Sequence, residues 1–198
     1  MSQYFENDDT VKHQIRRLEY AYGKYNFDFL SDNGVFAKNG VDYGSQLLIE
    51  TFLDNHHEGY VLDVGGGIGV VSIVLSKASD CLCDMVEVNC RAIELAKENI
   101  KLNKVSEKVN VILSDVYENV DKTYDYVITN PPIRAGKKVV YAFLFGAFNH
   151  LKENGELWFV MRKNHGLDSA IKDLKVEGIV CQIVDKDKGF FIVKAKKV

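Results

Sequence analysis

The apolar and polar positions of this chain predict an N-terminal hairpin followed by a helix. Large apolar side chains alternate with polar ones over Arg17–Tyr22 and Tyr25–Phe29, on the two sides of Gly23-Lys24. Alternation around a two-residue turn is typical of a β-hairpin, and glycine takes the positive φ that such a turn requires. Apolar positions over Ser45–Asp54 recur at helical spacing, so we expect a helix there.

From Tyr60 onward, short apolar runs alternate with amphipathic segments. The runs predict strands at Tyr60–Val64, Leu82–Val86, Val109–Leu113 and Tyr126–Thr129. The amphipathic segments predict helices at Val70–Lys77, Arg91–Leu102 and Lys137–Leu151. Strands and helices in alternation are typical of a parallel sheet that helices cover on both faces.

The pattern changes at the C-terminal end. A strand at Glu156–Met161 and a helix at Asp168–Lys175 are followed by two apolar runs, Ile179–Val184 and Phe190–Ala195. Only Asp185–Gly189 separates these runs, which is too short for the crossover that parallel strands need. The last two strands are therefore predicted to be antiparallel.

Length and composition favour a single globular domain. A chain of 198 residues can bury one substantial core but not two, so we expect one domain, with residues 1–43 as a hairpin extension of a core over residues 44–198. With 46% hydrophobic and 27% charged residues, no apolar run of membrane-spanning length and no signal peptide, we expect a cytoplasmic protein without a membrane partner. The net charge of −3 argues against coating nucleic acid by bulk electrostatics but permits a local basic patch.

The cysteines do not indicate a metal site. Cys81 and Cys83 flank one residue in an apolar run, and Cys90 and Cys181 do not form the second close pair that a zinc site requires. We expect buried, reduced thiols and no metal.

A glycine-rich segment, Asp63–Gly69, lies between a predicted strand and a predicted helix. Open parallel sheets bind ligands at such positions, although a glycine turn before a helix can also be purely structural. The spacing of Gly65, Gly67 and Gly69 differs from the Gly-x-Gly-x-x-Gly pattern of dinucleotide sites. Binding of a dinucleotide pyrophosphate by this segment is therefore disfavoured.

Acidic residues follow the next two predicted strands. Glu87 comes after Leu82–Val86, and Asp115 follows Val109–Leu113. A carboxylate at the first position suits ribose hydroxyls, and one at the second suits an adenine amino group. Either acid alone is best explained as a solvated strand end, but together with the glycine segment they indicate a nucleoside ligand.

The chain has only two prolines, Pro131 and Pro132, and they directly follow Asn130 at the end of a predicted strand. Two prolines fix φ and remove two N–H donors, which leaves carbonyl acceptors in a preset geometry. If the Asn130 oxygen and the Pro131 carbonyl accept both hydrogens of a planar amine, its delocalised lone pair turns toward an electrophile. A bare Pro-Pro would be a stiff turn, but the preceding Asn130 favours catalysis, so we predict Asn130, Pro131, Pro132 and Ile133 as the catalytic element.

Several segments resemble known methyltransferases. Asp63–Gly69, Glu87 and Asn130-Pro131-Pro132 resemble class I S-adenosylmethionine-dependent methyltransferases that act on amino groups. More specifically, Gly34-Val35-Phe36, Asp42-Tyr43-Gly44-Ser45, Asn130–Lys137 and Asp185–Phe190 resemble the catalytic domain of the ribosomal RNA small subunit methyltransferase C family, over nearly the whole chain. The string from Asn130 to Lys137 is far more specific than the glycine segment.

This resemblance implies a Rossmann-like, seven-stranded class I methyltransferase sheet, mostly parallel with an antiparallel C-terminal hairpin. It also implies methyl transfer from S-adenosyl-L-methionine to the exocyclic N2 amine of a guanine in 16S ribosomal RNA. Ile133 fits this branch, since many relatives that methylate adenine N6 or glutamine carry an aromatic residue there. The implied cofactor-binding residues are Phe36, Asp63, Gly65, Gly67, Gly69, Glu87, Asp115 and Asn130.

The implied partner is ribosomal RNA or the small ribosomal subunit. Some family members carry two such domains in tandem, whereas this chain has one, so RNA affinity is expected from this domain or its N-terminal hairpin. Arg134, Lys137 and Lys138 directly follow the catalytic turn and are predicted to neutralise RNA phosphates.

Other functions remain open. The acceptor could instead be adenine N6 in DNA or RNA, or a protein glutamine. A non-catalytic RNA-binding module would be expected to have lost the glycines, Glu87 or Asn130, and all are present. An NAD-dependent dehydrogenase fits less well, because the glycine spacing differs and no proton-transfer residue is evident.

Overall fold

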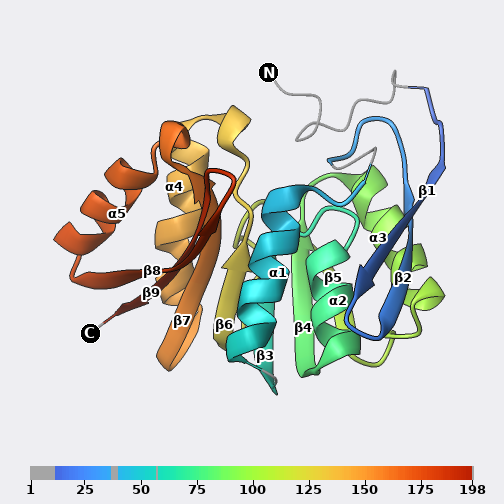
Figure 1. Ribbon diagram of the computed structural model, residues 1–198, viewed down its shortest axis with the longest axis horizontal. Coiled ribbons are helices and arrows are strands. Elements are labelled where there is room, and N and C mark those ends of the chain that lie inside the picture. The colour runs from blue at the N-terminus through green and yellow to red at the C-terminus, as the bar shows by residue number, and fades with distance from the viewer. Residues whose placement is uncertain (1–11, 37–39, 57, 198) are drawn as a thin grey trace.

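The computed structural model describes residues 12–36, 40–56 and 58–197. A two-stranded hairpin, β1 (Arg16–Tyr22) and β2 (Tyr25–Ser31), stands beside a large sheet flanked by helices (Figure 1). The other elements are α1 (Tyr43–Asn55), β3 (Glu58–Val64), α2 (Val70–Ala78), β4 (Asp80–Glu87), α3 (Cys90–Leu102), β5 (Val109–Leu113), β6 (Tyr124–Thr129), α4 (Lys137–Gly146), β7 (Leu151–Arg162), α5 (Leu167–Val176), β8 (Ile179–Asp187) and β9 (Phe190–Lys197), with short 3₁₀ turns at Ile133–Ala135, Ala147–Asn149 and Lys163–His165.

The large sheet has seven strands in the order β5-β4-β3-β6-β7-β9-β8. Strands β5, β4, β3, β6 and β7 are mutually parallel, and β9 is antiparallel to both β7 and β8. The mostly parallel seven-stranded sheet, its antiparallel C-terminal hairpin and the N-terminal hairpin are thus confirmed. Parallel strands end at one edge, so the segments that follow β3, β4 and β6 meet there and form the crevice where such sheets bind ligands.

The core lies in two layers, one on each face of the sheet. One apolar cluster joins the sheet to α1, α2 and α3, and the other joins it to α4 and α5. Along β3, Val61 belongs to the first cluster and its neighbour Leu62 to the second, and neither side chain is exposed. Because successive side chains of a strand point to opposite faces, a sheet covered on both faces requires the continuous apolar runs seen in the sequence.

The N-terminal hairpin is attached to α3 by two asparagine side chains. Asn99 accepts from the Leu30 backbone N–H at 2.6 Å and donates to the Leu30 carbonyl at 3.0 Å. Asn103 makes the same pair of contacts with Asp28, at 3.2 and 2.7 Å. Each carboxamide therefore satisfies one donor and one acceptor of β2, as a neighbouring strand would.

The predicted helix over Lys137–Leu151 is wrong at its C-terminal end. Helix α4 stops at Gly146, a 3₁₀ turn follows, and Leu151 is already the first residue of β7, paired with Tyr124. Gly146 lies against the ring of Tyr117, where a Cβ would come within 2.6 Å of the ring. The apolar spacing continues past this contact, so periodicity alone could not locate the helix end or the early start of β7.

The connection predicted at Asp185–Gly189 is also shorter than expected. Strand β8 continues through Asp187 and β9 begins at Phe190, so only Lys188 and Gly189 form the turn, with φ of 46° and 80°. Positive φ at both central residues is typical of the turns that close antiparallel hairpins. The charged residues suggested a loop, but β8 is an edge strand, where charges are common.

The cysteines agree only in part with the expectation of buried thiols. Cys81 and Cys83 are buried in β4 and Cys181 is half-buried, but Cys90 is exposed at the start of α3. Within the described residues no three His, Cys, Asp or Glu side chains converge as metal ligands. No helix in the same part of the chain is long and apolar enough to cross a membrane.

Candidate functional site

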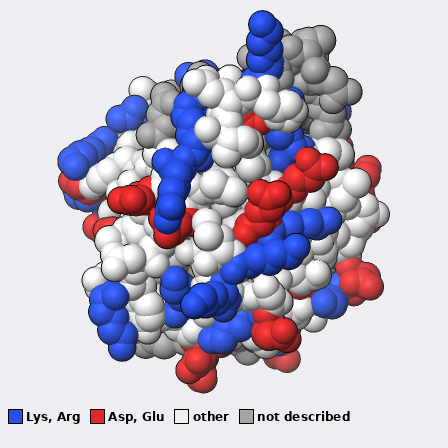
Figure 2. Space-filling view, turned by 90° about the vertical axis from the view of Figure 1, so that its right-hand side faces the viewer, with Lys and Arg blue, Asp and Glu red and all other residues white. Residues whose placement is uncertain are grey.

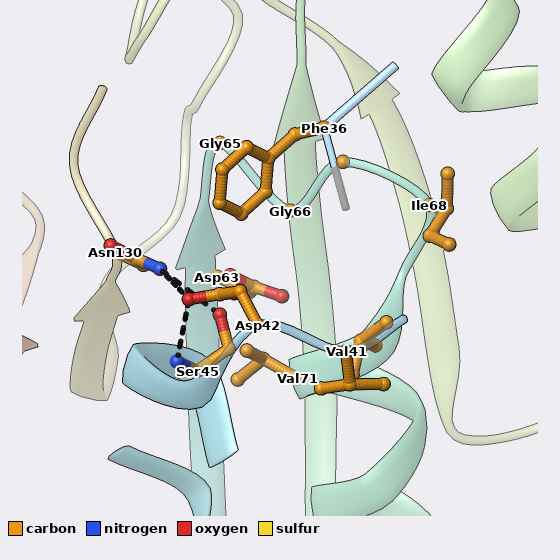
Figure 3. A pocket seen from close by; sticks show the side chains of 12 residues that line it. Phe36, Val41, Asp42, Ser45, Asp63, Gly65, Gly66, Ile68, Val71 and Asn130 are labelled. Carbon is orange, nitrogen blue, oxygen red and sulfur yellow. Dashed lines mark hydrogen bonds between the residues drawn. The ribbon is translucent and has the colours of Figure 1, made fainter. Parts of the chain in front are cut away.

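A pocket opens at the edge of the sheet where β3 and β6 end (Figure 3). The space inside the pocket, together with the open solvent at its mouth, is about 460 Å³. The residues that line it are Phe36, Val41, Asp42, Ser45, Asp63, Gly65, Gly66, Gly67, Ile68, Val70, Val71 and Asn130.

The pocket brings together five of the residues singled out from the sequence. Phe36, Asp63, Gly65, Gly67 and Asn130 all line its wall, although they come from three separate segments of the chain. Phe36 is half-exposed, and its ring lies over the glycine segment (Figure 3). These five residues therefore contribute an aromatic face, glycine backbone and two polar side chains to the walls.

The other predicted site residues do not line this pocket. Gly69 is buried at the start of α2, and Asp115 is exposed beyond the end of β5. Glu87 is not among the lining residues, but its carboxylate accepts the backbone N–H of Gly67, which is. The contact predicted between Asp115 and an adenine amino group thus stays a prediction.

Gly67 has the conformation and the surroundings of a ligand-contacting glycine. Its φ is +57°, a region that side chains with a Cβ rarely adopt. A Cβ built there would meet no protein atom within 4 Å, so protein packing does not require the missing side chain. Gly65 differs, because a Cβ there would lie 2.9 Å from the ring of Phe143. At Gly67 the absent side chain leaves room for a ligand beside the backbone.

Glu87 holds the glycine segment in place. Its carboxylate is only 9% exposed and accepts the backbone N–H groups of Gly67, Val88 and Asn89 at 2.8–2.9 Å. Burial raises the pKa of Glu87, and the three N–H donors oppose that rise. Each carboxylate oxygen has two acceptor sites, so Oε2 keeps one for a further donor such as a ribose hydroxyl.

Asp63 is a second buried acid, at the end of β3. It is 2% exposed and its Oδ2 accepts from Ser72 twice, from the hydroxyl at 2.8 Å and from the backbone N–H at 3.2 Å. Burial raises the pKa of Asp63 to about 6, and the nearby charge of Glu87 acts in the same direction. Near neutral pH its negative charge favours a cationic group in the pocket.

The Asn130 side chain is held by the residues that begin α1. Its Nδ2 donates to Asp42 Oδ1 at 3.2 Å and to Ser45 Oγ at 3.1 Å. Asp42 is the N-cap of α1, and the same Oδ1 accepts the Ser45 backbone N–H at 3.2 Å. The amide nitrogen of Asn130 therefore points toward α1, and its oxygen points away (Figure 3).

Sequence analysis assigned no role to Asp42 or Ser45. An aspartate three residues before a serine at the start of an amphipathic helix is a typical N-cap pattern, so the cap could have been predicted. The contact with Asn130 could not, since 85 or more residues separate the partners in the chain.

The proline pair leads from β6 into a 3₁₀ turn. Pro131 is buried, Pro132 is half-buried, and the Pro132 carbonyl accepts from the Ala135 N–H at 2.9 Å. No donor among the described residues reaches the Pro131 carbonyl. Ile133 packs against the apolar cluster under α4. Pro131 thus has a carbonyl acceptor to offer next to Asn130, which is what an amine-binding turn requires.

The basic residues after this turn differ in their surroundings. Arg134 and Lys138 are exposed, whereas the Lys137 amine lies 3.5 Å from Asp173 on α5 and 4.6 Å above the Tyr141 ring. On the opposite side of the molecule, which carries the N-terminal hairpin, basic and acidic side chains are interspersed (Figure 2). That face is not a uniformly basic surface.

The chain matches a family model described as "Methyltransferase small domain" over residues 26–194. The chain belongs to this family. It is also 42% identical to the protein YbxB of Bacillus subtilis (strain 168), over 98% of both chains. Membership explains why the glycine segment and the Asn130 turn occur together, since the matched region contains both.

Relatives of known name are longer. The chain is 36% identical to the ribosomal RNA small subunit methyltransferase C of Serratia proteamaculans (strain 568), over 71% of this chain and 41% of that protein. The corresponding Escherichia coli (strain K12 / DH10B) protein is 35% identical, over 75% of this chain and 45% of its own length. The chain thus spans less than half the length of these relatives.

Solved structures show the same fold. The 16S rRNA N2 G1207 methyltransferase of T. thermophilus, solved with AdoMet and guanosine, has a TM-score of 0.82 at 22% identity, over 93% of this chain and 51% of that one. The ribosomal protein L11 methylase of Lactobacillus delbrueckii subsp. bulgaricus has a TM-score of 0.67 at 18% identity, over 77% of this chain and 76% of that one. The sheet is therefore that of a Rossmann-like methyltransferase, a fold that serves both RNA and protein acceptors.

Proposed function

We propose that this protein is an S-adenosylmethionine-dependent methyltransferase that modifies the exocyclic N2 amine of a guanine in 16S ribosomal RNA. One observation carries the proposal: Asn130, which Pro131 and Pro132 follow, lines the same pocket as the glycine segment that begins at Asp63. The named relatives at 35–36% identity, which are small subunit rRNA methyltransferases, support the choice of acceptor.

The pocket's walls fit the proposed cofactor. Polar side chains, those of Asp42, Asp63, Ser45 and Asn130, gather at one end, and Phe36 contributes an aromatic face (Figure 3). S-adenosylmethionine joins a cationic amino acid to an aromatic base and supplies an activated methyl group on a positively charged sulfur. Its cationic part matches the carboxylates, and its nucleoside part matches the glycine segment and the ring.

Individual contacts follow from this orientation. We assign the ribose hydroxyls to the free acceptor site of Glu87, and the close approach of the cofactor to the backbone of Gly65 and Gly67. The carboxylate of Asp63 favours the cationic part from within the wall. Asp115 would have to approach the adenine amino group from the exposed end of β5.

Asn130 and Pro131 carry the proposed chemistry. The Oδ1 atom of Asn130 and the Pro131 carbonyl oxygen accept the two hydrogens of the guanine amine. This removes the amine from the plane of the base and directs the nitrogen lone pair at the methyl group. Both oxygens also stabilise the positive charge that develops on the nitrogen, and the surplus proton then passes to water.

The first test is methyl transfer by the purified protein. With isotope-labelled S-adenosylmethionine and unmodified 16S rRNA or small subunits, we expect the label in N2-methylguanosine. Removing the Asn130 acceptor in Asn130→Ala should lower the transfer rate by about 100-fold or more, since a preorganised hydrogen-bonding group contributes on that order. Cofactor affinity, measured by calorimetry, should change by less than about threefold, because the residue acts on the acceptor.

Asn149→Ala provides the matched control, because Asn149 is an exposed asparagine in the turn after α4. It should keep both the transfer rate and the cofactor affinity. Full activity of Asn130→Ala would overturn the mechanism, while leaving the family assignment intact.

Two alternative functions make different predictions in the same assay. The fold is shared with a ribosomal protein methylase, so a protein acceptor is the first alternative. Label in a protein glutamine would replace the RNA proposal. Label in N6-methyladenosine would replace guanine. RNA binding without any transfer would indicate a non-catalytic module. Ile133 favours guanine, since an aliphatic side chain there offers no ring for stacking on a target base.

We propose that RNA phosphates bind the exposed cations beyond the catalytic turn, Arg134 and Lys138, with Lys137 as a weaker contact because it already faces Asp173. Replacing Arg134 and Lys138 by alanine should weaken RNA binding and reduce the slope of log affinity against log salt by about one for each lost phosphate contact. Lys97→Ala, an exposed change on α3, is the control. An unchanged slope in the double variant would contradict the assignment.

A further inference from the structure

The contact between Asn130 and the first turn of α1 fixes the orientation of the Asn130 amide, with its NH₂ end toward Asp42 and Ser45. We propose that Asp42 and Ser45 are positioning residues, which orient the Asn130 carboxamide so that its oxygen meets the acceptor amine. The inference rests on the proposed function of Asn130. Its structural basis is the pair of hydrogen bonds from Asn130 Nδ2 to Asp42 Oδ1 and Ser45 Oγ, at 3.2 and 3.1 Å.

Orientation matters because the two ends of a carboxamide have nearly the same shape and opposite hydrogen-bonding character. The oxygen accepts, whereas the NH₂ group donates. An amine with two hydrogens to be held requires an acceptor, so a flipped Asn130 would place donor against donor. If no group bound the NH₂ end of Asn130, the side chain could rotate by half a turn and exchange the positions of its oxygen and nitrogen.

Asp42 can discriminate between these states and Ser45 alone cannot. A carboxylate only accepts, so it binds the NH₂ end of Asn130 and repels the oxygen end. A serine hydroxyl can donate or accept, so Ser45 supports either orientation. The discrimination therefore belongs to Asp42, and Ser45 strengthens the orientation that Asp42 selects.

Asp42 is itself held in place. Its Oδ1 caps α1 by accepting the Ser45 backbone N–H at 3.2 Å. Helix α1 is anchored by Leu48 and Phe52, neither of which is exposed to solvent. The orienting carboxylate thus lies at the end of a packed helix, the kind of rigid support that a catalytic group requires.

The competing explanation is that Asp42 only caps α1 and meets Asn130 incidentally. Ser45→Ala separates the two roles, since it removes one acceptor for Asn130 but keeps the backbone N–H that Asp42 caps. Orientation by Asp42 and Ser45 predicts a lower kcat for Ser45→Ala with an unchanged KM for the cofactor and little change in Tm. Ser76→Ala, at a serine equally buried in α2, should leave kcat unchanged.

A polarity swap gives the sharpest test. Asn130→Asp places two carboxylates against each other and should lower transfer by about 100-fold. Adding Asp42→Asn should recover about tenfold or more of that loss, a coupling of the size seen between contacting groups. In the double variant, the new amide at position 42 would cap α1 through its oxygen and donate through its nitrogen to the new carboxylate at position 130. The second oxygen of that carboxylate would face the amine. If the loss of transfer rate in the double variant equals the product of the losses in Asn130→Asp and Asp42→Asn alone, the proposal is wrong.

A spectroscopic measurement separates this proposal from the proposed function. In the wild-type protein, the side-chain N–H signals of Asn130 should be those of a hydrogen-bonded amide, and Ser45→Ala and Asp42→Asn should each shift them. Unchanged signals would overturn the orienting role whichever acceptor is methylated. If the signals shift and no amine is methylated, the orientation stands and the proposed reaction falls.

Discussion

At the scale of single residues, two buried acids, Asp63 and Glu87, lie in or beside the wall of the pocket, and burying their charges costs free energy. Asp63 and Glu87 are 2% and 9% exposed, and burial raises the pKa of both. A protein gains nothing in stability from such charges, so their retention next to a glycine segment indicates a use for negative charge there. We propose that Asp63 attracts the cationic part of the cofactor and that Glu87 holds the glycine segment beside it.

Asp63 should leave a clear signature in the pH dependence of stability. Its pKa rises from 3.8 to about 6 on folding, so between these values the folded state holds a proton that the unfolded state has lost. Stability therefore falls as the pH rises through this window, by about 3 kcal/mol at roughly 1.4 kcal/mol per unit. Asp63→Asn should lack this dependence.

Chemical denaturation of both proteins between pH 4 and pH 7 measures the effect. The unfolding free energy of the wild type should decline relative to that of Asp63→Asn as the pH increases. All other titrating groups are the same in the wild type and in Asp63→Asn, so their contributions cancel in the difference between the two unfolding free energies. Parallel curves would mean that Asp63 is not the buried acid described here.

Much of the site was predictable at this scale, because its residues carry strong local signals. The glycines at positions 65, 67 and 69 adopt positive φ, and the two prolines after Asn130 are the only prolines in the chain. The role of Asp42 was not predictable, because it depends on a contact between segments 88 positions apart. Such contacts follow from how β6 and α1 pack, which no local pattern reports.

At the scale of elements, α3 connects the N-terminal hairpin to the pocket. Asn99 on α3 binds both backbone groups of Leu30, and its Nδ2 also donates to the carbonyl of Ile68 in the glycine segment, at 3.0 Å. Asn103 binds Asp28 of the same strand but makes no contact with the glycine segment. Asn99 therefore links the hairpin to the glycine segment, and the hydrogen bonds of Asn103, one turn later, do not.

Replacing these asparagines should separate the two effects. Both Asn99→Ala and Asn103→Ala leave part-buried backbone groups of β2 without these partners, at a cost of about 1 kcal/mol each. Hydrogen exchange should therefore increase in the hairpin of both variants. Only Asn99→Ala should also increase exchange around Ile68 and weaken cofactor binding several-fold. Equal cofactor affinities in the two variants would show that the hairpin and the loop are independent.

The elements themselves were predicted best where burial sets the pattern. Strands β3 and β4 read as apolar runs because helices cover both faces, and α2 and α3 have clear amphipathic spacing. The predicted element boundaries were wrong where the local composition is typical of a different structure from the one that tertiary packing imposes. The charged end of β8 suggested a loop, and the apolar residues after Gly146 suggested more helix.

At the scale of the whole molecule, the fold sets the reaction class but not the acceptor. The same sheet is found in an rRNA methyltransferase and in a ribosomal protein methylase. We propose that the acceptor is chosen by the segment after Asn130, which contains Ile133 and Arg134. The chain spans less than half the length of its named relatives, so the acceptor of those proteins remains a proposal for this chain.

The most direct test of the account is the nucleoside content of 16S rRNA in cells that lack the gene. Mass spectrometry of digested rRNA should show the loss of one N2-methylguanosine per 16S molecule. Wild-type protein should restore that nucleoside. The Asn130→Ala protein should not restore it, even when it accumulates in the cell to the same level as the wild type. An unchanged N2-methylguanosine content in the deletion strain, or full restoration by Asn130→Ala, would contradict the central claim.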